Sequence, residues 1–384
     1  MAKILGDATE ELAAGLKNDM LAGLLNATFG NVVELVICIQ SLRQGLFRVV
    51  KATLLGSVLS NMLLVLGMSF FCGGIVNFRK PKVMPAMVRQ YSSESRGYSR
   101  ASRRPSIEPG AVLLDELPDQ EFQTHFVMEK VQKFQVMGAL VNISMLLLSC
   151  LSFVIVTIFD SVSHQSRDQD DDYMEHALLP VSRTSAIVVI SAYAAYIVFQ
   201  LGTHSGALAD EPDEDDDEAE PLISVCCSAM VLFVVTVLVA ISSEMLVEAI
   251  KGVTEEANLS EHFIGIVLLP IIGNACEHAA AVRFAMRDKL GLSIGIAIGS
   301  STQIALFAVP FAVLAGWAMD KPMDLNFGAL NTSVMTISVI VVLSMVVDGQ
   351  SNWLQGYLLM AAYVVIAICY WHLPNHMHDI SGTA

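Results

Sequence analysis

Two short stretches decide the fold, Gly30-Asn31-Val32-Val33-Glu34 and Gly273-Asn274-Ala275-Cys276-Glu277. Both read Gly-Asn-x-x-Glu inside otherwise apolar segments. Each glutamate is followed after 22 residues by a Gly-Ser pair, Gly56-Ser57 in the first case and Gly299-Ser300 in the second. Five residues that match at one spacing indicate an internal duplication.

The residues around these motifs are too apolar for a soluble domain. Of the 384 residues, 54% are hydrophobic and 16% are charged, whereas about a quarter of the residues in soluble domains are charged. Apolar segments long enough to cross about 30 Å of hydrocarbon fall at 20–42, 48–76, 134–159, 183–203, 222–246, 262–286, 291–316, 330–347 and 353–372. The sequence therefore predicts an all-α polytopic membrane protein with about nine transmembrane helices.

The duplication is predicted to be inverted. Glu34 lies in the first predicted span and Glu277 in the sixth. Helices that are an odd number of spans apart cross the membrane in opposite directions. The fold class that follows is an inverted-repeat transporter fold.

Several functions are disfavoured by composition. A net charge of −16 argues against a nucleic-acid partner, which would need a basic surface. The seven cysteines show no zinc-type spacing and no disulfide framework. The chain has no His-Glu-x-x-His pattern. We therefore expect neither an enzyme nor a cofactor.

The two glutamates predict a cation site. A carboxylate near the bilayer centre is costly unless it is paired, protonated or facing water, so Glu34 and Glu277 are functional candidates. The neutral oxygen donors expected beside them are Asn31, Asn274, Ser57, Ser300 and Gln303, with Ser60, Asn61 and Thr302 as secondary candidates. The serines and Thr302 have an alternative role in helix packing. An all-oxygen site suits Ca²⁺ first and Mn²⁺ next.

The same glutamates explain exchange. Burial favours the protonated carboxyl, and a bound divalent cation favours the carboxylate, so metal ions and protons compete for Glu34 and Glu277. His278 is a third candidate for proton coupling, with a hydrogen bond between helices as the alternative.

Two polar segments interrupt the apolar spans. The serine-rich insert 77–132 is predicted to be disordered. The linker 204–221 carries nine carboxylates, which either concentrate cations or form a solvated connection: Asp210, Glu211, Asp213, Glu214, Asp215, Asp216, Asp217, Glu218 and Glu220. The excess of Lys and Arg places both segments in the cytosol.

The motif residues resemble the vacuolar-type cation/proton exchanger family of the Ca²⁺/cation antiporter superfamily. The resemblance covers 25–35 and 54–64 in the first half, and Gly273-Asn274-Ala275-Cys276-Glu277-His278-Ala279 and 299–305 in the second. It implies eleven helices, with one helix outside two inverted five-helix halves. It also implies that Glu34 and Glu277 bind the cation and that the acidic run is a cytosolic segment between the halves.

The chain departs from the family pattern at its N-terminus. Ala8-Thr9-Glu10-Glu11-Leu12 resembles the end of the family's second helix, so we expect the first helix and most of the second to be absent. The expected units are 1–76 (first part of repeat 1), the insert 77–132, 133–203 (rest of repeat 1), the linker 204–221, 222–372 (repeat 2) and the tail 373–384. Cys276 stands where a smaller residue is usual.

The resulting hypothesis is an antiporter that moves Ca²⁺, with Mn²⁺ or other divalent cations as further substrates, from the cytosol into an acidic vacuole-like compartment in exchange for protons. Its partners would be Ca²⁺, H⁺ and the lipid bilayer, with a homo-oligomer or a full-length exchanger as protein partners. Na⁺-coupled exchange is disfavoured by the Glu-His and Gly-Ser-x-Thr-Gln-Ile features of the second half. The alternative is a truncated, non-transporting subunit or isoform that regulates a full-length exchanger.

Overall fold

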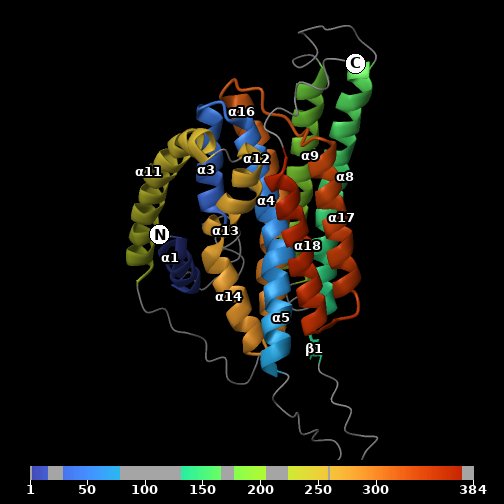
Figure 1. The fold of residues 1–384 in the computed structure, drawn as a ribbon. Helices are drawn as coiled ribbons and strands as arrows, with labels where there is room; N and C mark the ends of the chain where they lie inside the picture. The colour runs from blue at the N-terminus through green and yellow to red at the C-terminus, as the bar shows by residue number, and fades with distance from the viewer. Residues whose placement is uncertain are drawn as a thin grey trace, which may run out of the picture.

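The computed structural model describes residues 2–15, 29–77, 131–165, 177–204, 224–257 and 260–373, and they form a bundle of helices (Figure 1). The elements of the first half are α1 (Ala2–Gly15), α3 (Val32–Arg43), α4 (Phe47–Leu59), the π-helix η1 (Ser60–Val65), α5 (Leu66–Asn77), β1 (Gln132–Lys133), α8 (Val136–Gln165), α9 (Leu179–Val198) and the π-helix η4 (Phe199–Thr203). Those of the second half are α11 (Val225–Ala257), α12 (Glu261–Phe263), the π-helix η5 (Ile264–Leu268), α13 (Leu269–Gly273), α14 (Ala275–Met286), α15 (Leu290–Gln303), the π-helix η6 (Ile304–Ala308), α16 (Val309–Ala318), α17 (Ala329–Val346), β2 (Gln350–Ser351) and α18 (Trp353–Trp371).

The helical membrane fold predicted from the sequence is confirmed. Seven helices of the described residues are long and apolar enough to cross a membrane, and a pair bent by 62°, Ile264–Gly273 with Ala275–Met286, would make an eighth span. Each overlaps a predicted segment. The remaining predicted segment, 20–42, is described only in its second half, α3. Most of the insert and all nine carboxylates of the acidic linker lie outside the described residues.

The backbone repeats the duplication seen in the sequence. Asn31 has φ −108° and ψ 21°, and Asn274 has φ −94° and ψ 12°, so the same non-helical residue precedes α3 and α14. Past the ends of these helices, Gly45 and Asp288 occupy equivalent positions and adopt left-handed φ values of 73° and 67°. Figure 1 shows α3 leaving the centre of the bundle toward one end and α14 toward the other. The duplication is therefore inverted.

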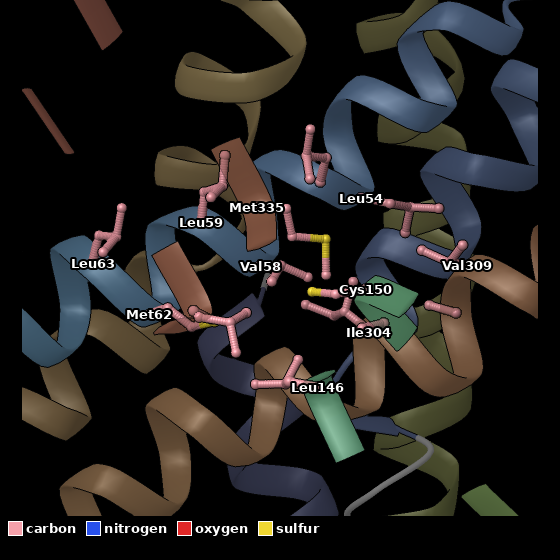
Figure 2. Close-up of a cluster of buried hydrophobic side chains, with 14 of the residues drawn as sticks. Leu54, Val58, Leu59, Met62, Leu63, Leu146, Cys150, Ile304, Val309 and Met335 are labelled. Carbon is pink, nitrogen blue, oxygen red and sulfur yellow. The ribbon is translucent and has the colours of Figure 1, made fainter. Parts of the chain in front are cut away.

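The helices that follow the two motifs form the centre of the bundle. The most apolar windows of Phe47–Asn77 and of Leu290–Ala318 are 83% and 72% buried, whereas the corresponding windows of α9, α11 and α18 are 22% buried. Figure 2 shows the cluster between the halves, which comprises Leu54, Val58, Leu59, Met62, Leu63, Leu146, Cys150, Ile304, Val309 and Met335. The outer helices expose side chains such as Phe233, 70% exposed, as expected for contact with lipid.

One end of the bundle carries both ends of the insert, and we call it the insert side. α5 ends there at Asn77, and β1 begins there at Gln132 and pairs with β2 in a two-residue antiparallel ladder. The Asn77 and Gln132 amides both donate to the Ala285 carbonyl oxygen, at 3.3 and 3.1 Å. The insert therefore leaves and rejoins the bundle beside the C-terminal end of α14.

Glycines allow α4 and η5 to cross at backbone contact. A Cβ added to Gly56 would lie 2.6 Å from the Cα of Ile266, and one added to Gly265 would lie 2.5 Å from the Cβ of Ala52. Small residues at such crossings let membrane helices approach closely. This contact holds the Gly-Ser helix of the first half against the bent span of the second.

The crossing predicts the effect of Gly56→Ala. The added methyl group must displace the η5 backbone, which for overpacking typically costs about 1–3 kcal/mol of stability. We expect a lower midpoint of thermal unfolding in detergent. Gly252→Ala is the control, because a Cβ there would meet no described atom within 4 Å. Equal midpoints for the two variants would contradict the close crossing.

Candidate cation site

Both Gly-Asn-x-x-Glu motifs lie at the start of a helix, and the second lies at the bend between α13 and α14. Asn31 is the residue preceding α3 and Asn274 the residue preceding α14, and Glu34 and Glu277 lie in the first turns of these helices. The N-terminus of a helix carries a partial positive charge, which favours a nearby carboxylate. The helix start therefore places each glutamate at a polar point in an apolar environment.

A chain of hydrogen bonds joins the two halves around Ser300. The Asn31 side-chain amide donates to Gln303 Oε1 at 2.7 Å, and the Asn61 amide donates to Ser300 Oγ at 3.0 Å. Ser300 Oγ lies within donating distance of Asn31 Oδ1 (3.2 Å) and of Glu277 Oε2 (3.3 Å). A hydroxyl has one proton and can satisfy only one of these acceptors at a time. Ser300 is therefore poised between an amide of one half and a carboxylate of the other.

The two glutamates face one cavity. Its volume is about 900 Å³, and its wall includes Glu34, Glu277, Asn274, Ser300 and Gln303. Toward the insert side the wall continues through Gln135, Gln200, Arg283, Arg287 and Gly291. The carboxylates of both halves are thus reached from the insert side through one aqueous space.

Glu34 approaches the opposite motif closely. Its side chain is buried, and its Oε1 lies 3.9 Å from the position that a Cβ on Gly273 would occupy. The first motif's carboxylate therefore lies beside the break in the second half's helix. The structure brings together Asn31, Glu34, Asn274, Glu277, Ser300 and Gln303 of the predicted set.

The other predicted donors divide into two groups. Asn61 joins the site through its bond to Ser300, and Ser57 is buried with no hydrogen-bond partner for its hydroxyl among the described residues. Ser60 donates to the Ser57 carbonyl oxygen, and Thr302 donates to the carbonyl oxygens of Ile298 and Asn142. Bonds of this kind satisfy a hydroxyl within a helix bundle. They favour the packing alternative for Ser60 and Thr302.

His278 lies beside the cavity and outside its described wall. The wall includes Cys276, Glu277 and Ala279, while the His278 side chain is buried and its Nε2 has no hydrogen-bond partner among the described residues. Within this described part of the chain, Nε2 therefore makes no hydrogen bond between helices. The role of His278 in proton coupling stays a prediction.

Two arginines of the wall were not expected from the sequence. Arg283 and Arg287 follow Cys276 and Ala280 along one face of α14, at the spacing of a helix surface. That spacing could have identified them. Asp7 and Thr9 of α1 also line the cavity, and no sequence pattern linked them to the two motifs.

Two inverted halves that meet at a pair of carboxylates, Glu34 buried and Glu277 half-buried, define a secondary transporter of the inverted-repeat antiporter class. Residues 1–93 and 227–371 match the family described as "Sodium/calcium exchanger protein", and the chain belongs to this family. It is 38% identical over 388 residues to vacuolar cation/proton exchanger 5 of Arabidopsis thaliana, a match that covers 99% of this chain and 75% of the relative. The resemblance to vacuolar cation/proton exchangers is confirmed.

Other relatives agree. The chain is 34% identical to the vacuolar calcium ion transporter of Schizosaccharomyces pombe, over 98% of this chain and 77% of the relative. It is also 34% identical to the Ca(2+)/H(+) antiporter of Synechocystis, over 98% and 88%. The solved structure of native YfkE has a TM-score of 0.67 and 30% sequence identity, and it covers 97% of this chain and 88% of that one. The crystal structure of the H+/Ca2+ exchanger CAX has a TM-score of 0.60 at 12% identity, covers 99% of this chain and 81% of that one, and supports the fold alone.

The position of Ser300 predicts the effect of Ser300→Ala. Loss of the hydroxyl removes an oxygen of the proposed site and the group that orients Asn31, Asn61 and Glu277 around the cation, and one such interaction is worth about 1–3 kcal/mol. We therefore expect Ca²⁺ to bind the purified protein about 5- to 100-fold more weakly. Ser301→Ala is the matched control, because Ser301 Oγ bonds only to backbone oxygens among the described residues, those of Ala297 and Val58. Equal affinities in a calorimetric titration of the two variants would count against the site.

Proposed function

We propose that this chain is a secondary antiporter that exchanges Ca²⁺ for H⁺. The observation that carries the proposal is the meeting of Glu34 and Glu277, from opposite halves, at one water-accessible cavity. Both belong to the duplicated motif, and duplicated carboxylates in apolar helices are expected to act on ions. Relatives named Ca(2+)/H(+) antiporter and vacuolar calcium ion transporter support the same substrates.

The donor set supports Ca²⁺ as the principal cation. The side chains brought together with Glu34 and Glu277 offer amide and hydroxyl oxygens, from Asn31, Ser300 and Gln303 among others. Hard divalent cations prefer such oxygen ligands, and two carboxylates balance a charge of +2. Mn²⁺ and other divalent cations are further proposed substrates.

Coupling follows from the cost of an unneutralised carboxylate pair. When the cation leaves, the two carboxylates, one buried and one half-buried, repel each other and are poorly solvated. Protons relieve both penalties. A site that reorients only when it holds either the cation or protons exchanges one for the other without a second site.

We further propose that the insert side faces the cytosol and that the protein lies in the membrane of a vacuole-like acidic compartment. The larger share of Lys and Arg on that side and the names of the vacuolar relatives support this orientation and location. The cavity that reaches the insert side then gives the state that accepts cytosolic Ca²⁺. Release occurs on the opposite side.

The alternative of a regulatory, non-transporting subunit receives less support. Within the described residues, each half contributes a carboxylate (Glu34 or Glu277), an asparagine (Asn31 or Asn274) and a central buried helix. A subunit that only modulates a partner has no need for both halves of a cation site. We therefore propose autonomous exchange.

The test is uptake of ⁴⁵Ca²⁺ into acid-inside vesicles that carry this chain. We expect uptake that disappears when the proton gradient is collapsed, and at least about 100-fold lower rates for Glu34→Gln and Glu277→Gln because each removes one neutralising carboxylate. A Na⁺ gradient should not replace the proton gradient.

The matched control is Glu248→Gln, which removes an exposed carboxylate from α11. It should transport at the wild-type rate. Uptake that persists in Glu34→Gln or Glu277→Gln would reject the proposed site. The absence of uptake by correctly inserted wild-type protein would reject autonomous exchange.

A further inference from the structure

On the side opposite the insert, one ion pair ties a central helix to a loop. Lys51 Nζ of α4 lies 2.7 Å from Asp324 Oδ1 and donates to the Asn326 carbonyl oxygen at 2.8 Å. The side chains of Lys51 and Asp324 are 17% and 9% exposed, so water screens the pair only partly. Lys51 precedes Ser57 on the same helix by about 9 Å of helical rise. A lysine within a membrane span is costly without such a partner.

The loop that carries Asp324, residues 319–328 between α16 and α17, is held by further bonds. The Asn326 backbone N–H donates to Asp324 Oδ1 at 2.6 Å, and the Asn326 side-chain amide donates to Asp160 Oδ2 of α8 at 2.7 Å. The Leu325 N–H donates to Ser182 Oγ of α9 at 3.2 Å. Through this loop, Lys51 connects α4 to α8 and α9.

The internal duplication relates the region around this ion pair to the large cavity on the insert side. A pocket of about 270 Å³ lies at the ion pair, and Arg48, Lys51 and Ala52 are among its lining residues. These three stand as far after Glu34 as Gly291, Ile294 and Gly295 stand after Glu277. All three of the latter line the large cavity on the insert side. The small pocket is therefore the closed counterpart of the open cavity.

The two halves differ at the position of Lys51. Where the first half has Lys51, the second has Ile294, which carries no charge. We propose that the Lys51–Asp324 ion pair is a latch that holds the opposite side closed while the cavity faces the insert side. Lys51 is thus a positioning residue for the exchange cycle. Because an isoleucine side chain cannot form an ion pair, Ile294 cannot latch the insert side in the same way.

Other charged groups surround the pair. Arg48 lies one turn before Lys51 on α4, Asp160 reaches it through Asn326, and His262 of α12 lines the same pocket. Removing Lys51 alone would leave Asp324 partly buried beside these groups without its direct partner. The clean disruption is therefore the double variant Lys51→Met/Asp324→Asn, which removes both charges and keeps an oxygen acceptor for the Asn326 N–H.

The latch proposal rests on the proposed exchange function in one respect, the assumption that the protein alternates between two open states. The accessibility of a cysteine on each side of the membrane tests the latch without a transport measurement. Thr53 is a reporter position for the opposite side. It is 2% exposed, its hydroxyl has no hydrogen-bond partner among the described residues, and it corresponds to Ile296 in the cavity wall. The substitution Thr53→Cys changes the side-chain volume little. The native Cys276, in the wall of the open cavity, reports on the insert side.

The experiment measures alkylation rates at position 53 of the Thr53→Cys reporter protein and at Cys276 by peptide mass spectrometry, in the full chain in lipid nanodiscs without Ca²⁺. When Lys51→Met/Asp324→Asn is added, we expect the introduced thiol at position 53 to react about fivefold faster or more, the smaller end of typical coupling between sites, and Cys276 to react more slowly. Arg43→Gln removes an exposed cation whose described bond is to Gln40, and it should change neither rate.

The conservative variant Lys51→Arg keeps the positive charge and the donors for Asp324 and the Asn326 carbonyl oxygen, and it should leave both rates near those of the reporter protein. Unchanged rates at both cysteines in the double variant would overturn the latch. Faster reaction at position 53 with no slowing at Cys276 would also overturn it, because local loosening, rather than a shift between states, gives that result. If this double variant does not fold, Lys51→Gln/Asp324→Asn, which also removes both charges, carries the same expectations and the same contradicting outcomes.

Discussion

The structure depends on one electrostatic constraint: two carboxylates that lie close together inside an apolar bundle cannot both stay charged without a counter-ion. Glu34 and Glu277 come from different halves and face one cavity. Water in the cavity and the N-terminal ends of α3 and α14 reduce the penalty. A divalent cation or protons can remove the rest, and this requirement makes the pair of glutamates an exchange site rather than a simple binding site.

The architecture serves that constraint. Each glutamate lies in the first turn of a helix, where polar backbone groups are exposed, and each such helix start needs a long buried helix beside it. The segments Phe47–Asn77 and Leu290–Ala318 are those neighbours, and they are the most buried spans described. Contact between Gly56 and the η5 backbone fixes one neighbour against the opposite half. The Ser300 network then joins donors from both halves, so that movement of either half changes the site.

Much of the fold and of the candidate site could be predicted because short motifs are repeated in the sequence. The Gly-Asn-x-x-Glu pairs identified both glutamates, and the distance to the Gly-Ser pairs identified the central helices, because duplicated residues report on a duplicated environment. Single residues were harder. Ser60 and Thr302 resemble site donors in sequence, but their hydroxyls bond to carbonyl oxygens of the bundle. Contacts between residues far apart in the chain leave no pattern in the sequence. Lys51 and Asp324, for example, are 273 positions apart.

The most direct test of the central claim is the number of protons released when Ca²⁺ binds to the purified protein. Calorimetric titration in two buffers of different ionisation enthalpy gives this number. Competition at the two carboxylates predicts proton release that falls as the pH rises and the site empties of protons. It also predicts that Glu34→Gln/Glu277→Gln abolishes both binding and release. Tight Ca²⁺ binding without proton release at any pH, or binding retained by the double variant, would contradict the account.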